Sequence, residues 1–350
     1  MSDEEEEVVD NTVTSEVHHF SKEEVLDAAR GGKDSHLTNT SDVGTPVALG
    51  SERLQEQEDE EYECLLGANG QVVLWSPKRD TVLSRFDFVY PPSLQTRGQQ
   101  LSKTPQVDSD GDLVVTRKND LHLQEGVVLI EHQSATTLEL VGEQVWRGAL
   151  FLADFILHHH DIFRGAHVLE VASGVGLTSV VAAMLATKVT VTDVDKGEIL
   201  PLIRRNLKRN EELLKAKVDV REIDFLNHAT IDDLQADCSD VSIILAADVV
   251  YSNPLTDEFF RTVLRLMTDP PDKMMYIALE KRYVFTMEDM DTCAPCYDYF
   301  LEGLEWLRCQ NLDLIDWTIE ELSTDFQQYF TYERVRHLVL WKINSKRKII

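Results

Sequence analysis

The sequence has no long apolar run and few basic residues. No stretch approaches the roughly 18 apolar residues that a membrane-spanning helix needs, and the start, MSDEEEEVVD, lacks the basic and apolar regions of a secretory signal. The five cysteines are scattered and odd in number, which argues against a disulfide framework and favours a reducing compartment. We therefore expect a soluble intracellular protein that does not act in a membrane.

The shortage of basic residues gives the chain a strong negative charge. Its 350 residues include 34 Lys and Arg against 62 Asp and Glu, a formal net charge of -28 at pH 7. Such a surface repels phosphate backbones, so direct nucleic-acid binding is disfavoured, and it attracts basic proteins. A hydrophobic content of 43% is nevertheless that of a globular protein.

The acidic excess is greatest at the start of the chain. Residues 1–63 hold 19 acidic and 4 basic residues without periodicity, so we predict a disordered acidic segment there. Residues 64–125 are predicted to be an N-terminal extension, in which VVLWSPKRDTVLSRFDFVY favours short strands and SLQTRGQQLSKTPQVDSDGD is typical of a loop. The run Asp108–Asp112 lacks the closing glutamate of a calcium loop, so we predict an acidic turn and no metal.

Residues 126–345 alternate between strand and helix patterns, which predicts one α/β domain. GVVLIEH is typical of a strand, and VGEQVWRGALFLADFILHHH has helical spacing. Helical segments then separate five β-rich runs: HVLEVA, KVTVTDV, VDVREI, VSIILAA and MMYIALE. The last two strand candidates, DLIDWTIEEL and RVRHLVLWKI, have no helix between them and should pair antiparallel. The expected fold is a Rossmann-like, seven-stranded mixed sheet with helices on both faces and an antiparallel C-terminal hairpin.

A glycine-containing turn follows the first of these strands. In VLEVASGVGLTS the turn from Ala172 to Gly176 joins a strand to a helix, where a ligand can approach the backbone and free N–H groups are available. The turn alone is a weak signal. A nicotinamide or flavin enzyme would have a third glycine where Ser179 stands, so an NAD-dependent dehydrogenase is a disfavoured alternative.

Carboxylates follow the next three strands. Asp193 is placed to accept the two hydroxyls of a ribose, although a helix-capping role would also explain it. Asp224 and Phe225 could bind the exocyclic amine and the face of a purine. Asp248 and Tyr251 lie just past the fourth strand, where open α/β sheets carry their reacting groups.

Together these pieces resemble the class I methyltransferases that use S-adenosylmethionine. Asp248-Val-Val-Tyr251 is similar to the D/E-x-x-Y motif of the family-16 protein methyltransferases, which are mostly lysine enzymes, and Trp146 matches their tryptophan. The resemblance covers roughly residues 105–345. It implies that Asp248 and Tyr251 face the substrate, and that the cofactor is bound by Trp146, Glu170, Ala172, Ser173, Gly174, Gly176, Asp193, Asp224, Phe225 and Ala247.

Two positions depart from the family pattern. Ala172 stands where glycine is usual, and its methyl group could tighten the turn and weaken cofactor binding; Phe225 replaces a tryptophan and keeps a stacking face. Methyl transfer from a sulfonium needs no metal, leaves S-adenosylhomocysteine, and requires the lysine amine in its neutral form. We hypothesise that Asp248 orients the incoming ammonium and that Tyr251 walls the channel.

The resemblance also implies a partner and a location. It predicts a basic protein substrate, a nuclear nucleic-acid-binding protein, and a place in the nucleus, with the cytosol as an alternative. A cofactor-binding adaptor that has lost turnover is the non-enzymatic alternative. Nucleic-acid amino methyltransferases usually have N/D-P-P-Y/F/W at the fourth strand, and the sequence lacks these prolines.

Overall fold

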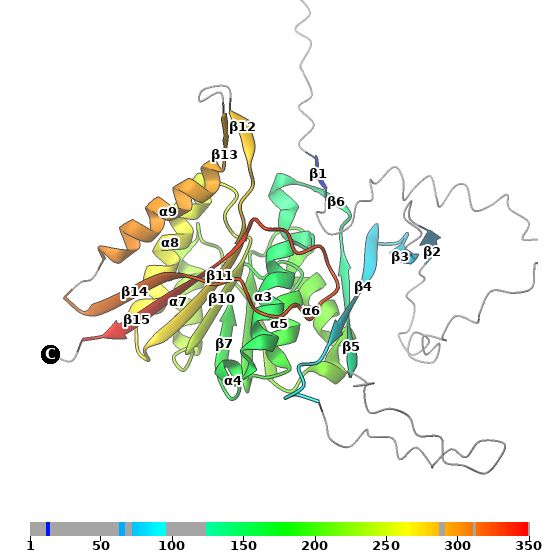
Figure 1. Ribbon diagram of the computed structural model, residues 1–350, viewed down its shortest axis with the longest axis horizontal. Coiled ribbons are helices and arrows are strands. Elements are labelled where there is room, and N and C mark those ends of the chain that lie inside the picture. The colour runs from blue at the N-terminus through cyan, green and yellow to red at the C-terminus, as the bar shows by residue number, and fades with distance from the viewer. Residues whose placement is uncertain are drawn as a thin grey trace, which may run out of the picture.

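A seven-stranded mixed sheet forms the centre of the fold, as predicted (Figure 1). The computed structural model describes residues 12–14, 63–66, 72–95, 124–286, 291–310 and 313–348. Five of the central strands run parallel, and the last two form an antiparallel hairpin next to them. The order across the sheet is β14 (Ile315–Leu322), β15 (Leu338–Arg347), β11 (Lys273–Glu280), β10 (Ile243–Ala247), β7 (His167–Glu170), β8 (Lys188–Asp193) and β9 (Lys217–Glu222).

Helices cover both faces of this sheet because its strands are apolar on both sides. Alternate strand residues belong to two separate cores: Val168 and Leu245 belong to one, and Leu169 and Ile244 belong to the other. The first core is completed by α3 (Arg147–His158), α5 (Leu177–Ala183) and α6 (Ile199–Arg209). The second is completed by α7 (His228–Asp237), α8 (Asn253–Thr268) and α9 (Pro295–Arg308). None of the helices in the described ranges is long and apolar enough to cross a membrane.

The predicted helix in VGEQVWRGALFLADFILHHH is shorter than its periodicity indicates. A 3-10 helix, η2 (Leu138–Glu143), comes first, and α3 begins only at Arg147, with Trp146 at its N-cap in an extended conformation. At the other end α3 stops at His158, and a separate short helix, α4 (His160–Phe163), follows. Gln144 therefore lies between η2 and α3, outside both helices.

A second sheet lies N-terminal to the main one in the sequence. Its strands, in order, are β2 (Glu63–Leu66), β3 (Val72–Ser76), β4 (Thr81–Val89) and β5 (Glu125–His132). Short strands therefore do occur in the extension, but β5, the predicted strand GVVLIEH, pairs with β4 and not with the seven-stranded sheet. A domain boundary between residues 125 and 126 would fall inside β5. The predicted loop over residues 96–112, including the acidic turn at Asp108–Asp112, lies outside the described residues.

Two short strand pairs complete the topology. β1 (Thr12–Thr14) pairs antiparallel with β6 (Ala135–Thr137), so these three residues of the predicted acidic segment form a strand. Apart from β1 and Glu63, that acidic segment lies outside the described residues. The second pair, β12 (Val284–Thr286) with β13 (Asp291–Cys293), forms a hairpin that projects from the end of β11 (Figure 1).

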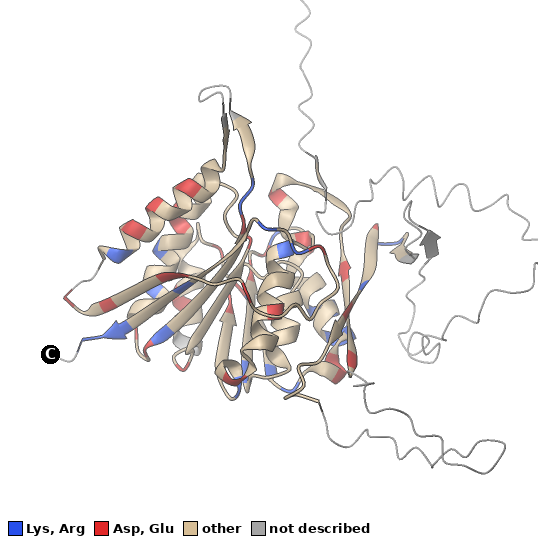
Figure 2. Ribbon diagram, in the orientation of Figure 1, with Lys and Arg blue, Asp and Glu red and all other residues tan. Residues whose placement is uncertain are grey.

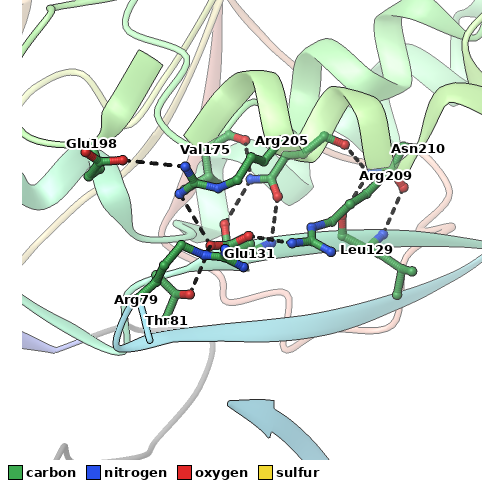
Figure 3. Close-up of polar contacts among 10 residues, drawn as sticks. Arg79, Thr81, Leu129, Glu131, Val175, Glu198, Arg205, Arg209 and Asn210 are labelled. Carbon is green, nitrogen blue, oxygen red and sulfur yellow. Dashed lines mark hydrogen bonds and ion pairs between the residues drawn. The ribbon is translucent and has the colours of Figure 1, made fainter. Parts of the chain in front are cut away.

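A buried carboxylate joins the four-stranded sheet to α6 (Figure 3). Glu131 of β5 has a fully buried side chain and lies 2.8 Å from Arg79, 3.3 Å from Arg205 and 2.7 Å from Arg209. The Thr81 hydroxyl donates a further hydrogen bond of 3.0 Å to Glu131. The three guanidinium groups hold the pKa of Glu131 below its usual value, against the opposing effect of burial. The side chain is therefore an anion that connects both parts of the fold.

Candidate functional site

A pocket lies at the carboxyl ends of β7, β8 and β10, where open α/β sheets bind their ligands. It encloses about 760 Å³, including space open to solvent. One wall is the segment of η2 and the N-cap of α3, and the other walls follow the three strands. The structure brings together eight predicted site residues in this pocket: Trp146, Ala172, Ser173, Gly174, Asp193, Ala247, Asp248 and Tyr251.

The turn after β7 has the left-handed backbone that its glycines predict. Gly174 and Gly176 have φ values of 56° and 84°, and Gly176 is the N-cap of α5. A side chain at Gly174 would place its Cβ 3.1 Å from the Gly142 carbonyl oxygen of the opposite wall. Ala172 also has a positive φ, 49°, although it carries a Cβ. The turn therefore brings its backbone close to the facing wall, at the cost of strain at Ala172.

Ala172→Gly should relieve that strain. A left-handed alanine costs about 1–2 kcal/mol, and glycine loses about 0.5–1 kcal/mol of chain entropy on folding. We expect unchanged or slightly higher stability and a dissociation constant for S-adenosylhomocysteine that is equal or up to about fivefold lower, measured by calorimetry. Ala229→Gly, at an exposed helical position of α7, is the matched control and should only lose stability. A clear loss of affinity in Ala172→Gly would contradict the placement of the turn.

Asp193, at the end of β8, stabilises this turn through a hydrogen bond to its backbone. Its Oδ2 accepts a hydrogen bond of 2.8 Å from the Gly174 N–H, and its Oδ1 accepts one of 2.8 Å from the Val194 N–H. Burial raises the pKa of Asp193 to about 6, although both hydrogen bonds favour the charged form. A carboxylate has about four lone-pair sites, so two remain for ribose hydroxyls. The predicted ribose contact thus stays a prediction that the geometry permits.

Asp248 lies past β10 with a left-handed backbone, φ 51°, and a side chain whose two oxygens are both engaged. Oδ2 accepts a hydrogen bond of 2.6 Å from the Gly148 N–H of α3, and Oδ1 accepts one of 2.9 Å from the Glu280 N–H of β11. A Cβ at Gly148 would lie 2.4 Å from Oδ2, so only glycine fits there. Burial raises the pKa of Asp248, opposed mainly by Arg282. The predicted catalytic carboxylate therefore also holds α3 and β11 together.

Two aromatic residues complete the pocket walls. Trp146 donates from Nε1 to the Val141 carbonyl at 2.9 Å, and the Arg282 guanidinium lies 4.6 Å from the centre of its ring. Tyr251 is half-buried, and burial, followed by the nearby Asp193, raises the pKa of its phenol. Tyr251 is consequently neutral at physiological pH and suited to a wall or a hydrogen bond, not to accepting a proton.

Four predicted cofactor residues do not line this pocket. Glu170 is buried behind the turn and accepts a hydrogen bond from the Ser179 hydroxyl, so it positions α5 instead of facing the pocket. Gly176 acts through its backbone conformation. Asp224 accepts a hydrogen bond of 2.9 Å from the Leu226 N–H, and the Phe225 ring packs on Phe259 at 5.8 Å. Direct contact of these four with a cofactor is therefore not supported by the pocket lining.

Two polar residues before Trp146 also line the pocket, and no motif in the sequence predicts them. Glu143 lines the pocket and accepts a hydrogen bond of 2.8 Å from the Glu198 N–H at the start of α6. Gln144 also lines it and is 1% exposed. Their only signal in the sequence was that two polar residues interrupt an otherwise helical apolar pattern. Among the residues that the structure describes, no group of His, Cys, Asp or Glu side chains is arranged to hold a metal ion.

The buried carboxyls near the turn predict how stability depends on pH. Burial raises the pKa of Glu170 from 4.5 to about 8 and that of Asp193 from 3.8 to about 6. Between the lower and upper values the folded protein keeps protons that the unfolded chain has released, so the free energy of unfolding falls as pH rises. This contribution is fully present below pH 4 and is lost by about pH 8.

Glu170→Gln should remove the part of this dependence that Glu170 causes. Glutamine can still accept the Ser179 hydrogen bond and does not ionise. Between pH 6 and pH 8 we expect the melting temperature of the wild type to fall by roughly 5 °C more than that of the variant. Melting curves by circular dichroism in matched buffers measure the difference, and parallel curves for the two proteins would be the contrary result.

Comparison with known proteins places this pocket in a known family. The family model described as lysine methyltransferase matches residues 125–292. Methyltransferase-like protein 22 from Mus musculus is 38% identical over 232 residues, which cover 62% of this chain but only 59% of that protein. Its Homo sapiens counterpart is 35% identical over 298 residues, covering 71% of this chain and 72% of that protein.

A putative methyltransferase from Streptococcus mutans in complex with SAH is 15% identical, has a TM-score of 0.34, and covers 53% of this chain and 95% of that one. The sequence matches are the stronger finding, because identity above a third extends over most of both the chain and the human relative. The chain belongs to the lysine methyltransferase family.

Proposed function

We propose that the protein transfers a methyl group from S-adenosylmethionine to a lysine side chain of a protein substrate. The observation that carries the proposal is the meeting of Asp193, Asp248 and Tyr251 in one pocket bordered by the left-handed turn. Family membership supports the same chemistry. It also disfavours an NAD-dependent dehydrogenase, as does Ser179 in place of the third glycine of the dinucleotide-binding pattern.

The residues of the pocket fit this cofactor. The Ser173 hydroxyl, buried at the turn, has no hydrogen-bond partner among the described residues, so a ligand could satisfy it. Asp193 and Asp248 complement a sulfonium cation. When bound, the cofactor supplies the methyl group on a sulfur leaving group, and this chemistry needs no metal.

The protein's own residues would then align and orient. Asp193 would accept the ribose hydroxyls, with Trp146 and Ala247 on the pocket walls. Asp248 would attract the substrate ammonium, and Tyr251 would exclude water beside it. A free lysine has a pKa of about 10.4, so it must lose a proton before it attacks. Since Tyr251 is neutral and both oxygens of Asp248 already accept hydrogen bonds, that proton would leave through water or on desolvation.

A surface beside the pocket would bind the protein substrate. The Glu280 N–H donates a hydrogen bond to Asp248, and the Arg282 guanidinium lies over the Trp146 ring. The three residues after Arg282, which are Tyr283, Val284 and Phe285, are 49%, 48% and 61% exposed. These three residues, the hairpin patch, continue outward from the pocket wall. Exposed apolar side chains beside a pocket could contact a bound protein. The hairpin leads into α9, whose exposed side carries Asp298, Glu302 and Glu305 (Figure 2).

This combination suits a basic protein with an apolar residue near its target lysine. The net charge of -28 supports the same class of partner. As part of the proposal, the substrate is a nuclear nucleic-acid-binding protein and the enzyme acts in the nucleus. That part rests on the resemblance alone, and fractionation of cells with an antibody to the protein tests it: recovery in the cytosolic fraction only would exclude the nuclear location.

Phe285→Ser should weaken substrate methylation without affecting the cofactor. Losing one well-packed aromatic contact typically costs 1–2 kcal/mol, so kcat/KM for the protein substrate should fall by roughly tenfold. Leu314→Ser is the matched control, because Leu314 is also an exposed apolar residue, 42% accessible, but precedes β14 at the opposite end of the sheet. Equal kcat/KM in both variants would show that the hairpin patch does not contact the substrate.

Methyl incorporation is the direct test of the proposed function. Cell extract is incubated with the protein and tritiated S-adenosylmethionine, and the labelled peptide is mapped by mass spectrometry. Label on a lysine that depends on the added protein is expected. A cofactor-binding adaptor would also bind S-adenosylmethionine but would give no label, and that result would favour the adaptor.

A further inference from the structure

The N-terminal strand β1 lies next to the pocket although more than a hundred residues separate them in the sequence. Thr12, Val13 and Thr14 pair in antiparallel register with Thr137, Thr136 and Ala135 of β6 (Figure 1). β6 leads directly into η2, which forms one wall of the pocket. A strand from the start of the chain is thereby joined to the wall that faces the glycine turn.

One side chain connects β1 to this wall. The Nε2 of Gln144 donates hydrogen bonds of 2.7 Å to the Val13 carbonyl and of 2.7 Å to the Thr136 hydroxyl. Since a carbonyl can only accept, the Gln144 amide must present its nitrogen to β1, and its oxygen faces elsewhere. The orientation of this buried amide is therefore fixed by β1 and β6 together.

The other end of that amide has no partner among the residues that the structure describes. Gln144 is 1% exposed, and its Oε1 accepts no hydrogen bond from the described residues. The backbone of Gln144 also approaches the turn: its carbonyl oxygen lies 3.8 Å from the position of a Cβ built on Gly174. A buried acceptor left without a donor is costly, and such groups in binding sites are commonly satisfied by the ligand.

We propose that β1 is part of the cofactor site and that it acts through Gln144. The Gln144 amide oxygen takes a hydrogen bond from a donor of the ligand, and an ammonium is the strongest donor that the amino-acid part of S-adenosylmethionine offers. β1 holds the amide in the orientation that presents this oxygen. Docking of β1 and binding of the cofactor therefore strengthen each other. This inference rests on the proposed function.

Two truncations isolate β1 from the acidic residues before it. Removing residues 1–10 deletes the acidic run and leaves β1, whereas removing residues 1–14 deletes β1 as well. We expect the shorter truncation to bind S-adenosylhomocysteine like the full chain by calorimetry. The longer truncation should bind about tenfold more weakly. Equal affinity of the two truncations would overturn the proposal.

Point variants test whether β1 acts through Gln144. Gln144→Leu should weaken binding by tenfold or more, about 1.4 kcal/mol, and removing residues 1–14 from this variant should add nothing. Additive losses would mean that β1 acts by another route. Thr136→Val keeps β1 and removes only one partner of the amide, so it should weaken binding by a few fold. It also serves as the second variant if the truncated chain does not fold.

Hydrogen exchange gives a readout that does not depend on measuring affinity. Because coupling is reciprocal, S-adenosylhomocysteine should slow amide exchange at Thr12–Thr14 by the same factor by which β1 improves binding. In Gln144→Leu the ligand should no longer protect these amides. If the full chain does not bind S-adenosylhomocysteine at all, the proposed function itself fails. If it binds but leaves exchange in β1 unchanged, only the present inference fails.

Discussion

Asp248→Ala is expected to lower the rate of methyl transfer by roughly 100-fold, since each 1.4 kcal/mol of lost stabilisation is a factor of ten. Two causes act together. The variant loses the anion that orients the substrate ammonium in the proposed mechanism. It also removes the acceptor of the Glu280 N–H and of the buried Gly148 N–H, and a buried donor left unpaired costs about 1–3 kcal/mol. Single-turnover rates with the mapped substrate measure the effect.

Companion measurements separate the two causes. Gly148→Ala keeps the carboxylate but pushes a Cβ against it. If Asp248 has a purely structural role, the two variants should lose the same turnover for the same loss of melting temperature. An orienting role predicts that Asp248→Ala loses more turnover than Gly148→Ala at equal stability. Asp313→Ala, an exposed carboxylate before β14, should change neither. Unchanged turnover in Asp248→Ala would remove Asp248 from the mechanism.

Much of the catalytic fold could be predicted because its signals are local. Parallel strands such as Ile243–Ala247 are continuous apolar runs, and β7, β8, β9 and β10 are each followed by a helix. The glycines of the turn after β7 predict its left-handed backbone. Asp193 at the end of β8 and Asp248 after β10 reach the same edge of the sheet because parallel strands end on the same side. For these reasons eight of the twelve predicted site residues meet in one pocket.

The remaining features depend on contacts between distant segments. Nothing near Val13 in the sequence indicates that its carbonyl binds Gln144, and β5 looks like any strand of the main sheet until its pairing with β4 is known. Glu170 resembles a ligand residue in its motif, yet its side chain faces Ser179. Side-chain direction at the end of a strand is decided by packing, which a single sequence does not reveal.

Glu131→Ala should be strongly destabilising and leave the pocket intact. Glu131 is completely buried, and its removal would take away an anion that pairs with Arg79, Arg205 and Arg209 (Figure 3). Removing one partner of a buried ion pair typically costs 3–5 kcal/mol. Urea unfolding followed by circular dichroism should show a loss of about this size. Asp87→Ala, which breaks an exposed pair with Arg85, should cost under about 1 kcal/mol.

The same variant tests whether the extension is separable from the catalytic part. Glu131 lies on β5 and pairs with two arginines of α6. Cutting the chain between residues 125 and 126 would remove β4, which pairs with β5, and Arg79, which pairs with Glu131. If the four-stranded sheet and the main sheet unfold as one unit, wild type and Glu131→Ala will each show one transition. The midpoint alone will then shift.

The pH dependence of stability also tests whether Glu131 links the two sheets. The pKa of Glu131 is lowered in the folded protein, so its contribution is present above its ordinary value of 4.5 and is lost as pH falls through the folded value. The stability difference between wild type and Glu131→Gln should therefore shrink in acid, opposite in sign to the effect of Glu170→Gln. Two separate unfolding transitions in the wild type, or a stability difference that grows in acid, would mean that Glu131 does not join the two sheets into one cooperative unit.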